Sequence, residues 1–362
     1  MRIVVLGAGI AGLSTAHALC ARGAEVVVLE REPYVFSHSS GRNAAIYRPV
    51  EDSTGIAELA RVSARHLDAL AGTRDRWLDQ RGLLLVAADA APIHALERVA
   101  ERDGVNVQRL DVTELHTRAP ALAGGHVRDG LWVPDGGVLD PHAIGSLLAS
   151  AIRDAGGRIL LGADVGRVLM EGGRVAGVVL SGGETFAADA VVLAAGAWAE
   201  ALGAAAGASL PLTPIRRHLV ILEPSAAVDP RATTVWDVGL QAYFRPESGG
   251  LLASPCDELA WRPEVPAPDP AALELLAERL RTLAPGLAES RVRRSWACLR
   301  TFAPDRRLVI GADPRVTGLH WVAGLGGYGM SSGVGAGELA ARVIFGEQSA
   351  LSAALAPARL VT

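Results

Sequence analysis

The sequence contains no lysine, because all 35 of its basic residues are arginine. A pyridoxal-phosphate imine, a lysine Schiff base and the phosphate-binding lysine of a Walker motif each need a lysine side chain. The sequence therefore excludes these three chemistries.

Cysteine is also scarce. Cys20, Cys256 and Cys298 are widely spaced and odd in number, a pattern that predicts neither a disulfide framework nor a metal site. The net charge of −4 argues against a nucleic-acid partner, which normally needs a basic face. No apolar run reaches the roughly 20 residues of a membrane helix. We expect no cleavable signal region and a cytoplasmic protein.

The remaining composition is typical of a globular enzyme. Half of the 362 residues are hydrophobic and a fifth are charged, and this length predicts two domains. Strand–helix alternation predicts an α/β fold with interleaved domains. We expect a nucleotide-binding domain over 1–45, 141–205 and 305–362, and a substrate domain over 46–140 and 206–304.

The most informative motif lies at the N-terminus. An apolar strand over 2–6 leads into Gly7-Ala8-Gly9-Ile10-Ala11-Gly12, a helix follows over 13–22, and a second strand ends at Glu30. Gly7 permits the tight turn, Gly9 admits a pyrophosphate, and Gly12 allows close helix packing. Unpaired N–H groups at the helix start attract the phosphates, and Glu30 is placed to accept bonds from a ribose hydroxyl. The motif predicts a dinucleotide site and disfavours NADP.

Hydrophobic periodicity and glycine or proline breaks predict the other elements. Helices are expected over 56–80, 91–103, 141–155, 271–283 and 331–344. Strands are expected over 82–87, 189–193, 219–222, 241–245, 250–254, 292–301, 308–311 and 320–323. Segments 158–161, 165–169 and 174–180 alternate with glycine pairs and are expected to form hairpins. A second glycine turn, 324–330, precedes the last helix, an arrangement that favours a larger flavin held from both ends.

Together these segments resemble the D-amino acid oxidase superfamily of FAD-dependent oxidoreductases, in its glycine oxidase and sarcosine oxidase group. The resemblance covers nearly the whole chain. It rests on the N-terminal motif, the loop 39–45, the turn 194–198, the strand 296–300 and the turn 326–330. It implies a glutathione-reductase-like FAD-binding Rossmann domain interleaved with a mixed-sheet substrate domain.

The resemblance also implies which residues contact FAD. They are Gly7, Gly9, Ile10, Ala11, Gly12, Glu30, Arg31, Ser39, Ser40, Arg42, Asn43, Ala44, Ala45, Val165, Ala195, Gly196, Trp198, Gly326, Gly329, Met330 and Ser331. Sarcosine-oxidase relatives bind flavin covalently through a cysteine near the position of Cys298. We expect non-covalent FAD, with a covalent bond to Cys298 as the alternative.

Within this group, the loops are most similar to those of D-arginine dehydrogenases. That similarity implies that Arg300 and Tyr243 bind the substrate carboxylate, and that the Gly327 carbonyl accepts from its amine. A guanidinium fork matches a carboxylate, and a phenol adds a donor. Arg216 and Arg217 are adjacent, so only one faces inward, and we expect Arg217 to lie near the substrate. Tyr328 is expected to pack at the pocket.

Two departures concern the side-chain pocket. A histidine and a glutamate of D-arginine dehydrogenases match Ile46 and Leu83 here. An apolar pair cannot neutralise a buried cation, so we expect the substrate side chain to be non-cationic. Arg48 and Glu51 lie close in sequence and leave this argument open. An oxygen-activating lysine of sarcosine oxidases matches Leu252, which favours a dehydrogenase over an oxidase.

The implied reaction oxidises a D-amino acid. Hydride leaves Cα for the flavin, and the imino acid hydrolyses to a 2-oxo acid and ammonia. The alternatives are oxidation of sarcosine, glycine or a cyclic secondary amino acid, or a role as the flavin subunit of a hetero-oligomeric amine dehydrogenase. The electron acceptor is left open.

Overall fold

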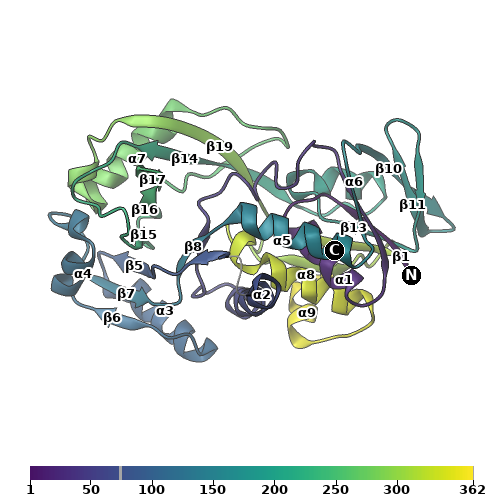
Figure 1. The fold of residues 1–362 in the computed structure, drawn as a ribbon, viewed down its shortest axis with the longest axis horizontal. Helices are drawn as coiled ribbons and strands as arrows, with labels where there is room; N and C mark the ends of the chain where they lie inside the picture. The colour runs from purple at the N-terminus through teal and green to yellow at the C-terminus, as the bar shows by residue number, and fades with distance from the viewer. Residues whose placement is uncertain (73–75, 362) are drawn as a thin grey trace.

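The computed structural model describes residues 1–72 and 76–361, which form two sheet-based halves side by side (Figure 1). One half holds both chain ends and a six-stranded sheet in the order β20-β21-β13-β1-β2-β9. Its strands are β1 (Arg2–Leu6), β2 (Glu25–Glu30), β9 (Arg158–Leu161), β13 (Ala190–Leu193), β20 (Val309–Ala312) and β21 (Leu319–Ala323). Only β20 runs antiparallel to its neighbour.

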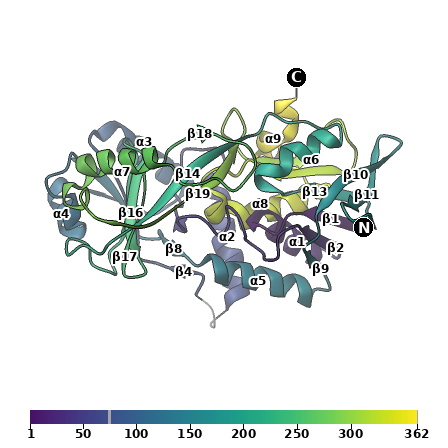
Figure 2. The same ribbon diagram turned by 90° about the horizontal axis from the view of Figure 1, so that it is seen from above.

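Helices cover this parallel sheet, as parallel strands require. Four of them share one apolar core: α1 (Ile10–Cys20), α2 (Ile56–Ala71), α5 (Pro141–Asp154) and α8 (Gly329–Ile344). On the other face lie α6 (Ala199–Ala205) and the sheet of β10 (Val165–Glu171), β11 (Arg174–Leu180) and β12 (Thr185–Ala187), while α9 (Ala350–Leu355) packs on β20. Figure 2 shows α5 along one side of this half and α6 and α9 on the other.

The small residues of α8 let three helices meet closely. A Cβ on Gly337 would lie 2.4 Å from a backbone atom of Ser14 on α1, and one on Gly335 would lie 2.3 Å from the Leu59 carbonyl oxygen on α2. Only glycine fits at such contacts. Helix α2 thus packs in the nucleotide-side core although it lies in the segment predicted for the substrate domain.

The second half is a nine-stranded, mainly antiparallel sheet in the order β18-β14-β17-β16-β15-β5-β7-β6, with β19 also paired to β14. Its strands are β5 (Leu83–Ala87), β6 (Gln108–Leu110), β7 (Asp129–Val133), β14 (Thr213–Leu222), β15 (Thr234–Asp237), β16 (Ala242–Glu247), β17 (Gly250–Ser254), β18 (Leu259–Ala260) and β19 (Val292–Phe302). Helices α3 (Ala90–Asp103), α4 (Val112–Arg118) and α7 (Pro270–Leu283) flank it.

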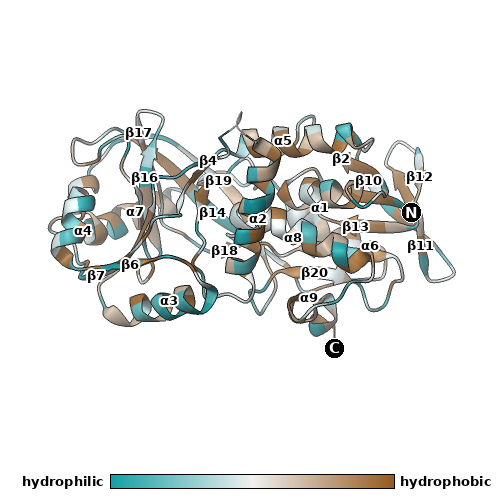
Figure 3. Ribbon diagram, turned by 60° about the horizontal axis from the view of Figure 1, so that its bottom comes forward, coloured by the Kyte–Doolittle hydropathy of each residue, from teal (hydrophilic) through white to brown (hydrophobic). Residues whose placement is uncertain are grey.

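A small sheet joins the halves: β3 (Ile46–Tyr47), β8 (Gly137–Leu139) and β4 (Leu78–Asp79). Hydropathy follows this layering. In Figure 3 the outward faces of α2 and α3 are hydrophilic, whereas the central strands are hydrophobic. Among the described residues, no helix combines the length and apolarity needed to cross a bilayer.

Two predictions about elements were wrong. The helix predicted over 56–80 ends at Ala71, because Gly72 takes a left-handed φ of 57°; residues 73–75 lie outside the described residues, and 78–79 form β4. The segment 158–161 is not in a hairpin: β9 pairs in parallel with β2 after the α5 crossover. The hairpin prediction holds for β10 and β11.

Candidate active site

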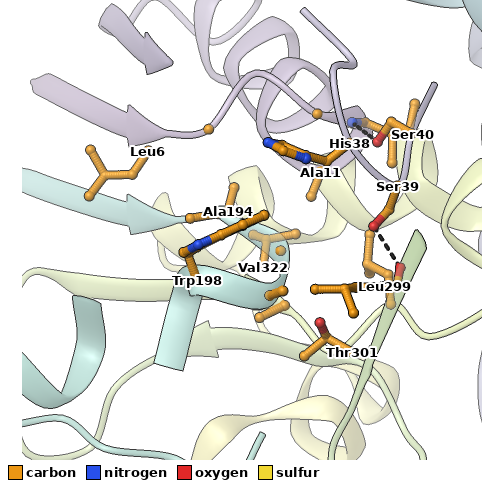
Figure 4. Close-up of a pocket in the computed structure, with 18 of the residues that line it drawn as sticks. Leu6, Ala11, His38, Ser39, Ser40, Ala194, Trp198, Leu299, Thr301 and Val322 are labelled. Atoms are coloured by element: carbon orange, nitrogen blue, oxygen red, sulfur yellow. Dashed lines mark hydrogen bonds between the residues drawn. The ribbon is translucent and has the colours of Figure 1, made fainter. Parts of the chain in front are cut away.

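A cavity of about 430 Å³ runs between the two halves, from the start of α1 to strand β19 (Figure 4). Many of the predicted cofactor and substrate residues line it. They are Gly7, Gly9, Ile10, Ala11, Glu30, Arg31, Ser39, Ser40, Asn43, Val165, Ala195, Gly196, Trp198, Arg300, Gly326, Gly327, Gly329 and Met330. The lining thus draws on three separate stretches of the chain, within 6–43, 163–205 and 299–330.

The N-terminal turn has the form of a cradle for a dinucleotide. Gly7 has φ = +104°, and a Cβ there would lie 2.7 Å from the Ala194 carbonyl oxygen. A Cβ on Gly12, which lies beneath the turn, would lie 1.8 Å from the Gly7 carbonyl oxygen. The adjacent N-cap, Gly9, has no side chain to close the start of α1. The N–H groups of Gly7, Ala8 and Ile10 donate to the Leu29 carbonyl, Glu30 and Ser40. The N–H groups of Gly9 and Ala11, which both line the cavity, are left to suit a pyrophosphate.

Glu30 lies at the end of β2, beside this turn. Its Oε2 accepts from the Ala8 N–H at 2.7 Å, and its Oε1 accepts from the Glu32 N–H at 3.0 Å. The carboxylate is therefore fixed at the cavity wall with lone pairs to spare, as a ribose hydroxyl requires.

The loop 37–45 links the cofactor cradle to the substrate sheet. Ser39 Oγ donates to the Leu299 carbonyl at 2.7 Å, as the dashed line in Figure 4 shows. Arg42 Nη2 donates to the Ala297 carbonyl at 3.2 Å, and Arg42 itself lines a small neighbouring cavity instead of the main one. The loop therefore holds β19 directly against the cofactor cavity.

Contacts within the loop, and one from Arg245, hold the conformation of residues 43–45. Ala45 has a left-handed φ of 54°, costly for a residue with a Cβ. Asn43 holds this conformation, because its Oδ1 accepts from the Ala45 N–H at 2.6 Å. The buried Arg245 donates from Nε to the Ala44 carbonyl at 2.8 Å. These contacts fix the loop whose other face lines the cavity.

Trp198 packs against two side chains, of which the sequence analysis predicted only Arg31 at the site. The Arg31 guanidinium lies 4.1 Å from the centre of the Trp198 ring, and the His38 ring lies 4.6 Å from it on a tilted plane. His38 also bonds Glu32 through Nε2 at 2.9 Å. Sequence reasoning missed His38, although its place in a polar loop before Ser39 was a usable signal.

The substrate-side residues gather on one face of the nine-stranded sheet. Arg217 lies opposite Cys298 on the β14–β19 pair, and Arg300 follows two residues later, so all three share a face. Arg216 faces away, stacked over Trp261 and paired with Asp269. Arg217 is therefore the inward-facing member of the adjacent pair.

Arg300 is buried, with 7% of its surface exposed. Its Nη1 lies 3.0 Å from the Cys298 sulfur and 3.0 Å from the Leu299 carbonyl oxygen. Within the described ranges, no carboxylate lies within 4.0 Å of it. Burial raises the pKa of Tyr243, although the charges of Arg300 and Arg217 nearby act in the opposite direction. The phenol therefore stays protonated as a donor beside an unpaired guanidinium.

Ile46, Leu83 and Tyr243 belong to one buried cluster with Leu252 and Cys298. Leu83 is fully buried and Ile46 nearly so, and neither they nor Tyr243 line the cavity itself. The cluster is apolar packing beside the site. Ser331, at the start of α8, braces it by donating from Oγ to the Ile46 carbonyl at 3.2 Å.

Arg48 and Glu51 form an ion pair of 3.1 Å, and both side chains are largely buried. The Arg48 guanidinium lies 4.7 Å from the centre of the Trp236 ring, which itself lies 4.7 Å from Tyr243. Sequence reasoning left this pair open and missed Trp236. Because Glu51 is neutralised by Arg48, it does not offer a free acid to a cationic substrate.

Tyr328 lies between these groups, immediately before α8. Its pKa is raised to about 12, mainly by burial and in part by the charge of Glu51, while Arg48, Arg306 and Arg217 act in the opposite direction. These five side chains are therefore close enough to share one electrostatic environment at the Gly327 end of the cavity.

Comparisons with known proteins agree with this architecture. The family model described as "FAD dependent oxidoreductase", named DAO, matches residues 2–343. A D-amino acid dehydrogenase of Cereibacter sphaeroides is 27% identical, covering 98% of this chain and 94% of its own. The L-proline dehydrogenase of P. horikoshii has a TM-score of 0.89 at 24% identity, covering 99% of this chain and 97% of its own.

The glycine oxidase of Geobacillus kaustophilus has a TM-score of 0.84 at 24% identity and matches both chains over their full length. The family match and these folds agree with the glycine cradle, the fixed Glu30 carboxylate and the cavity reaching Arg300, all of which fit FAD. The chain therefore belongs to the DAO family of FAD-dependent oxidoreductases.

Proposed function

We propose that this enzyme oxidises the Cα–N bond of a D-amino acid with a non-cationic side chain. The observation that carries the proposal is Arg300, a buried guanidinium with no carboxylate partner in the described structure. An unpaired buried charge costs several kcal/mol, and a substrate carboxylate would remove that cost. Relatives named D-amino acid dehydrogenase support the D configuration.

The chain's own residues would bind and orient the substrate. Arg300 and Tyr243 would hold the carboxylate, and the Gly327 carbonyl would accept a hydrogen bond from the neutral amine. Bound FAD supplies a two-electron acceptor for the hydride that leaves Cα. Positioning by these groups accounts for most of the protein's contribution, so no side-chain base is needed.

The cofactor-binding half would comprise 1–45, 141–205 and 305–362, and the substrate half 46–140 and 206–304, with α2 packed across that division. The apolar cluster that contains Ile46 and Leu83 supports a non-cationic side chain, because it offers no carboxylate to a cation. Leu252, buried in the same cluster, supports an electron acceptor other than oxygen, because no cation stands at that position to activate oxygen.

The test is anaerobic bleaching of the bound flavin by paired D- and L-amino acids. We expect the D member of each productive pair to bleach the flavin, while D-arginine does not. Bleaching only by sarcosine, glycine or proline would favour the alternative substrates, namely sarcosine, glycine or a cyclic secondary amino acid. Structural relatives named glycine oxidase and L-proline dehydrogenase support that alternative. Turnover by the purified chain alone, with an artificial acceptor, would exclude an obligate partner subunit.

A further inference from the structure

One part of the outer wall of the main cavity is made of side chains that hold one another. Arg31 and Glu32 follow strand β2, His38 lies in the loop 37–45, and Trp198 lies in the turn after β13. We call these four residues the clasp. Arg31, His38 and Trp198 line the cavity. Arg31 is also exposed and the other three are half-buried, so the clasp lies between the cavity and solvent.

The clasp is joined through one carboxylate and one ring. Glu32 Oε1 accepts from Arg31 Nε at 3.1 Å and from His38 Nε2 at 2.9 Å. The hydrogen bond to His38 is the largest cause of a lowered pKa at Glu32. The Arg31 guanidinium and the His38 ring also pack against the Trp198 ring, 4.1 and 4.6 Å from its centre. His38 and Trp198 reach toward each other from different segments (Figure 4).

The two rings form a thin wall. His38 and Trp198 line the main cavity and also the small neighbouring cavity of about 10 Å³. Val265, which lines the small cavity as well, is exposed. The stacked rings therefore separate the main cavity from a hollow that lies close to the molecular surface.

The backbone beneath the clasp is fixed, whereas its side chains are held weakly. The Glu32 carbonyl accepts from the Gly162 N–H at 3.2 Å, and the Trp198 N–H donates to the Ala195 carbonyl at 3.0 Å. By contrast, cation–π contacts and ion pairs that water reaches contribute little. The clasp therefore opens by rotation of side chains, without movement of a strand or a helix.

The clasp lies over the part of the cavity that suits the ADP half of the cofactor. Glu30, which is placed for a ribose hydroxyl, directly precedes Arg31. Ser40, which follows His38 by two residues, accepts from the Ile10 N–H at the start of α1, beside the position for the pyrophosphate. The clasp thus joins the ribose end of this region to its pyrophosphate end.

We propose that the clasp gates the cofactor: it opens before FAD enters or leaves, and it closes over the ADP half. Every contact that holds it joins two protein groups, so the closed clasp does not depend on FAD. A gate of this kind slows entry and release by the same factor and leaves the equilibrium affinity unchanged. A wall that only touches FAD slows release alone.

The test measures both rates by flavin fluorescence. Entry is followed after the apoprotein is mixed with FAD in a stopped flow, and release is followed after dilution of the holoenzyme. Arg31→Gln and His38→Gln each remove one contact with the Trp198 ring and should raise both rates about two- to fivefold. Trp198→Leu removes both contacts and should raise them about tenfold. The Kd should stay within about twofold of the wild-type value.

Arg118→Gln is the matched control. The Arg118 guanidinium lies 4.5 Å from the centre of the Trp132 ring in the other half of the molecule, and neither residue lines the cavity. Both rates should therefore equal those of the wild type. Thermal unfolding of each apoprotein shows whether the variant is folded. Arg31→Gln, at an exposed position, keeps the test decisive if Trp198→Leu is unstable.

Two results would overturn the proposal. Faster release with unchanged entry would make the clasp an ordinary contact of FAD, and unchanged rates in all three variants would remove it from the path of the cofactor. ADP and FMN then locate the clasp. When excess FAD displaces them from the apoprotein, ADP should leave faster in Trp198→Leu and FMN should leave at the wild-type rate. Faster release of FMN alone would contradict a clasp over the ADP half.

Discussion

The Ser40 hydroxyl accepts a hydrogen bond from the Ile10 backbone N–H at 2.9 Å, across 30 residues of sequence. Gly9, the N-cap of α1, has no side chain to make this bond. The loop that contacts β19 through Ser39 therefore also caps the nucleotide-binding helix. Cofactor and substrate elements meet through this one loop, and its conformation should govern both.

Asn43→Ala should loosen this loop. The substitution removes the bond to the Ala45 N–H and the bond from Nδ2 to the Ser40 carbonyl, 2.6 Å long. Each such bond contributes about 0.5–1.5 kcal/mol, so we expect FAD affinity to fall about tenfold in a titration of the apoprotein. Ala45→Gly relieves the left-handed backbone and should preserve affinity. Unchanged affinity in the Asn43 variant would contradict the role given to this loop.

Arg300→Gln should abolish carboxylate recognition without loss of FAD. Breaking a buried charge pair costs about 3–5 kcal/mol, which corresponds to a fall in kcat/KM of about two to four orders of magnitude. Arg300→Lys keeps the positive charge but loses the two parallel donors of the guanidinium. Its kcat/KM should lie between the values of the wild type and of Arg300→Gln. The exposed Arg294 on the same strand provides the control variant Arg294→Gln, whose kinetics should match those of the wild type.

Gly12→Ala should yield protein without flavin. The new Cβ would lie 1.8 Å from the Gly7 carbonyl oxygen, a backbone clash that must displace α1 from the turn. Gly182→Ala is the matched control, since a Cβ there meets nothing within 4 Å. The measurement is the ratio of flavin to protein absorbance after purification. A Gly12 variant that retains full flavin content would refute the cradle assigned to this turn.

Acid precipitation should release the flavin from the wild-type protein. The Cys298 sulfur contacts Arg300 and lines the small neighbouring cavity, and it does not line the main cavity. Cys298→Ala should therefore retain its FAD. Yellow colour that stays with the precipitated wild-type protein and disappears in this variant would establish the covalent alternative.

His320 should make stability fall in mild acid. Burial lowers the pKa of His320 from 6.5 to about 4. The unfolded chain therefore takes up this proton first as the pH falls, and stability is lost between about pH 6.5 and 4, by at most about 1.4 kcal/mol per pH unit. His320→Gln should flatten this part of the curve in urea unfolding, whereas His142→Gln, at an exposed site, should not. Equal slopes would contradict the assignment.

Local signals predicted some parts of this structure well. The glycines of the turn between β1 and α1 lie close together in the sequence, and so do the small residues of α8. Each group reflects backbone contact within or beside one helix, so a short stretch of sequence was enough to predict it. The short strands β7 and β15 lack a clear alternating pattern and were missed. Glu258 Oε1 accepts from Arg306 Nη2 at 2.6 Å. This contact arises only when the residue before β18 and the turn after β19 meet in three dimensions, so no spacing in the sequence indicated it.

The strand order of the six-stranded sheet also constrains synthesis of the protein. Strand β1, made first, lies between β2 and β13, and β13 in turn needs β21 near residue 320. An emerging chain therefore cannot complete this sheet, or the cavity beside it, until almost all of it has left the ribosome. Contacts of such long sequence separation slow folding, so the nascent chain exposes its apolar strands for most of translation and should depend on chaperones until the last strand is added.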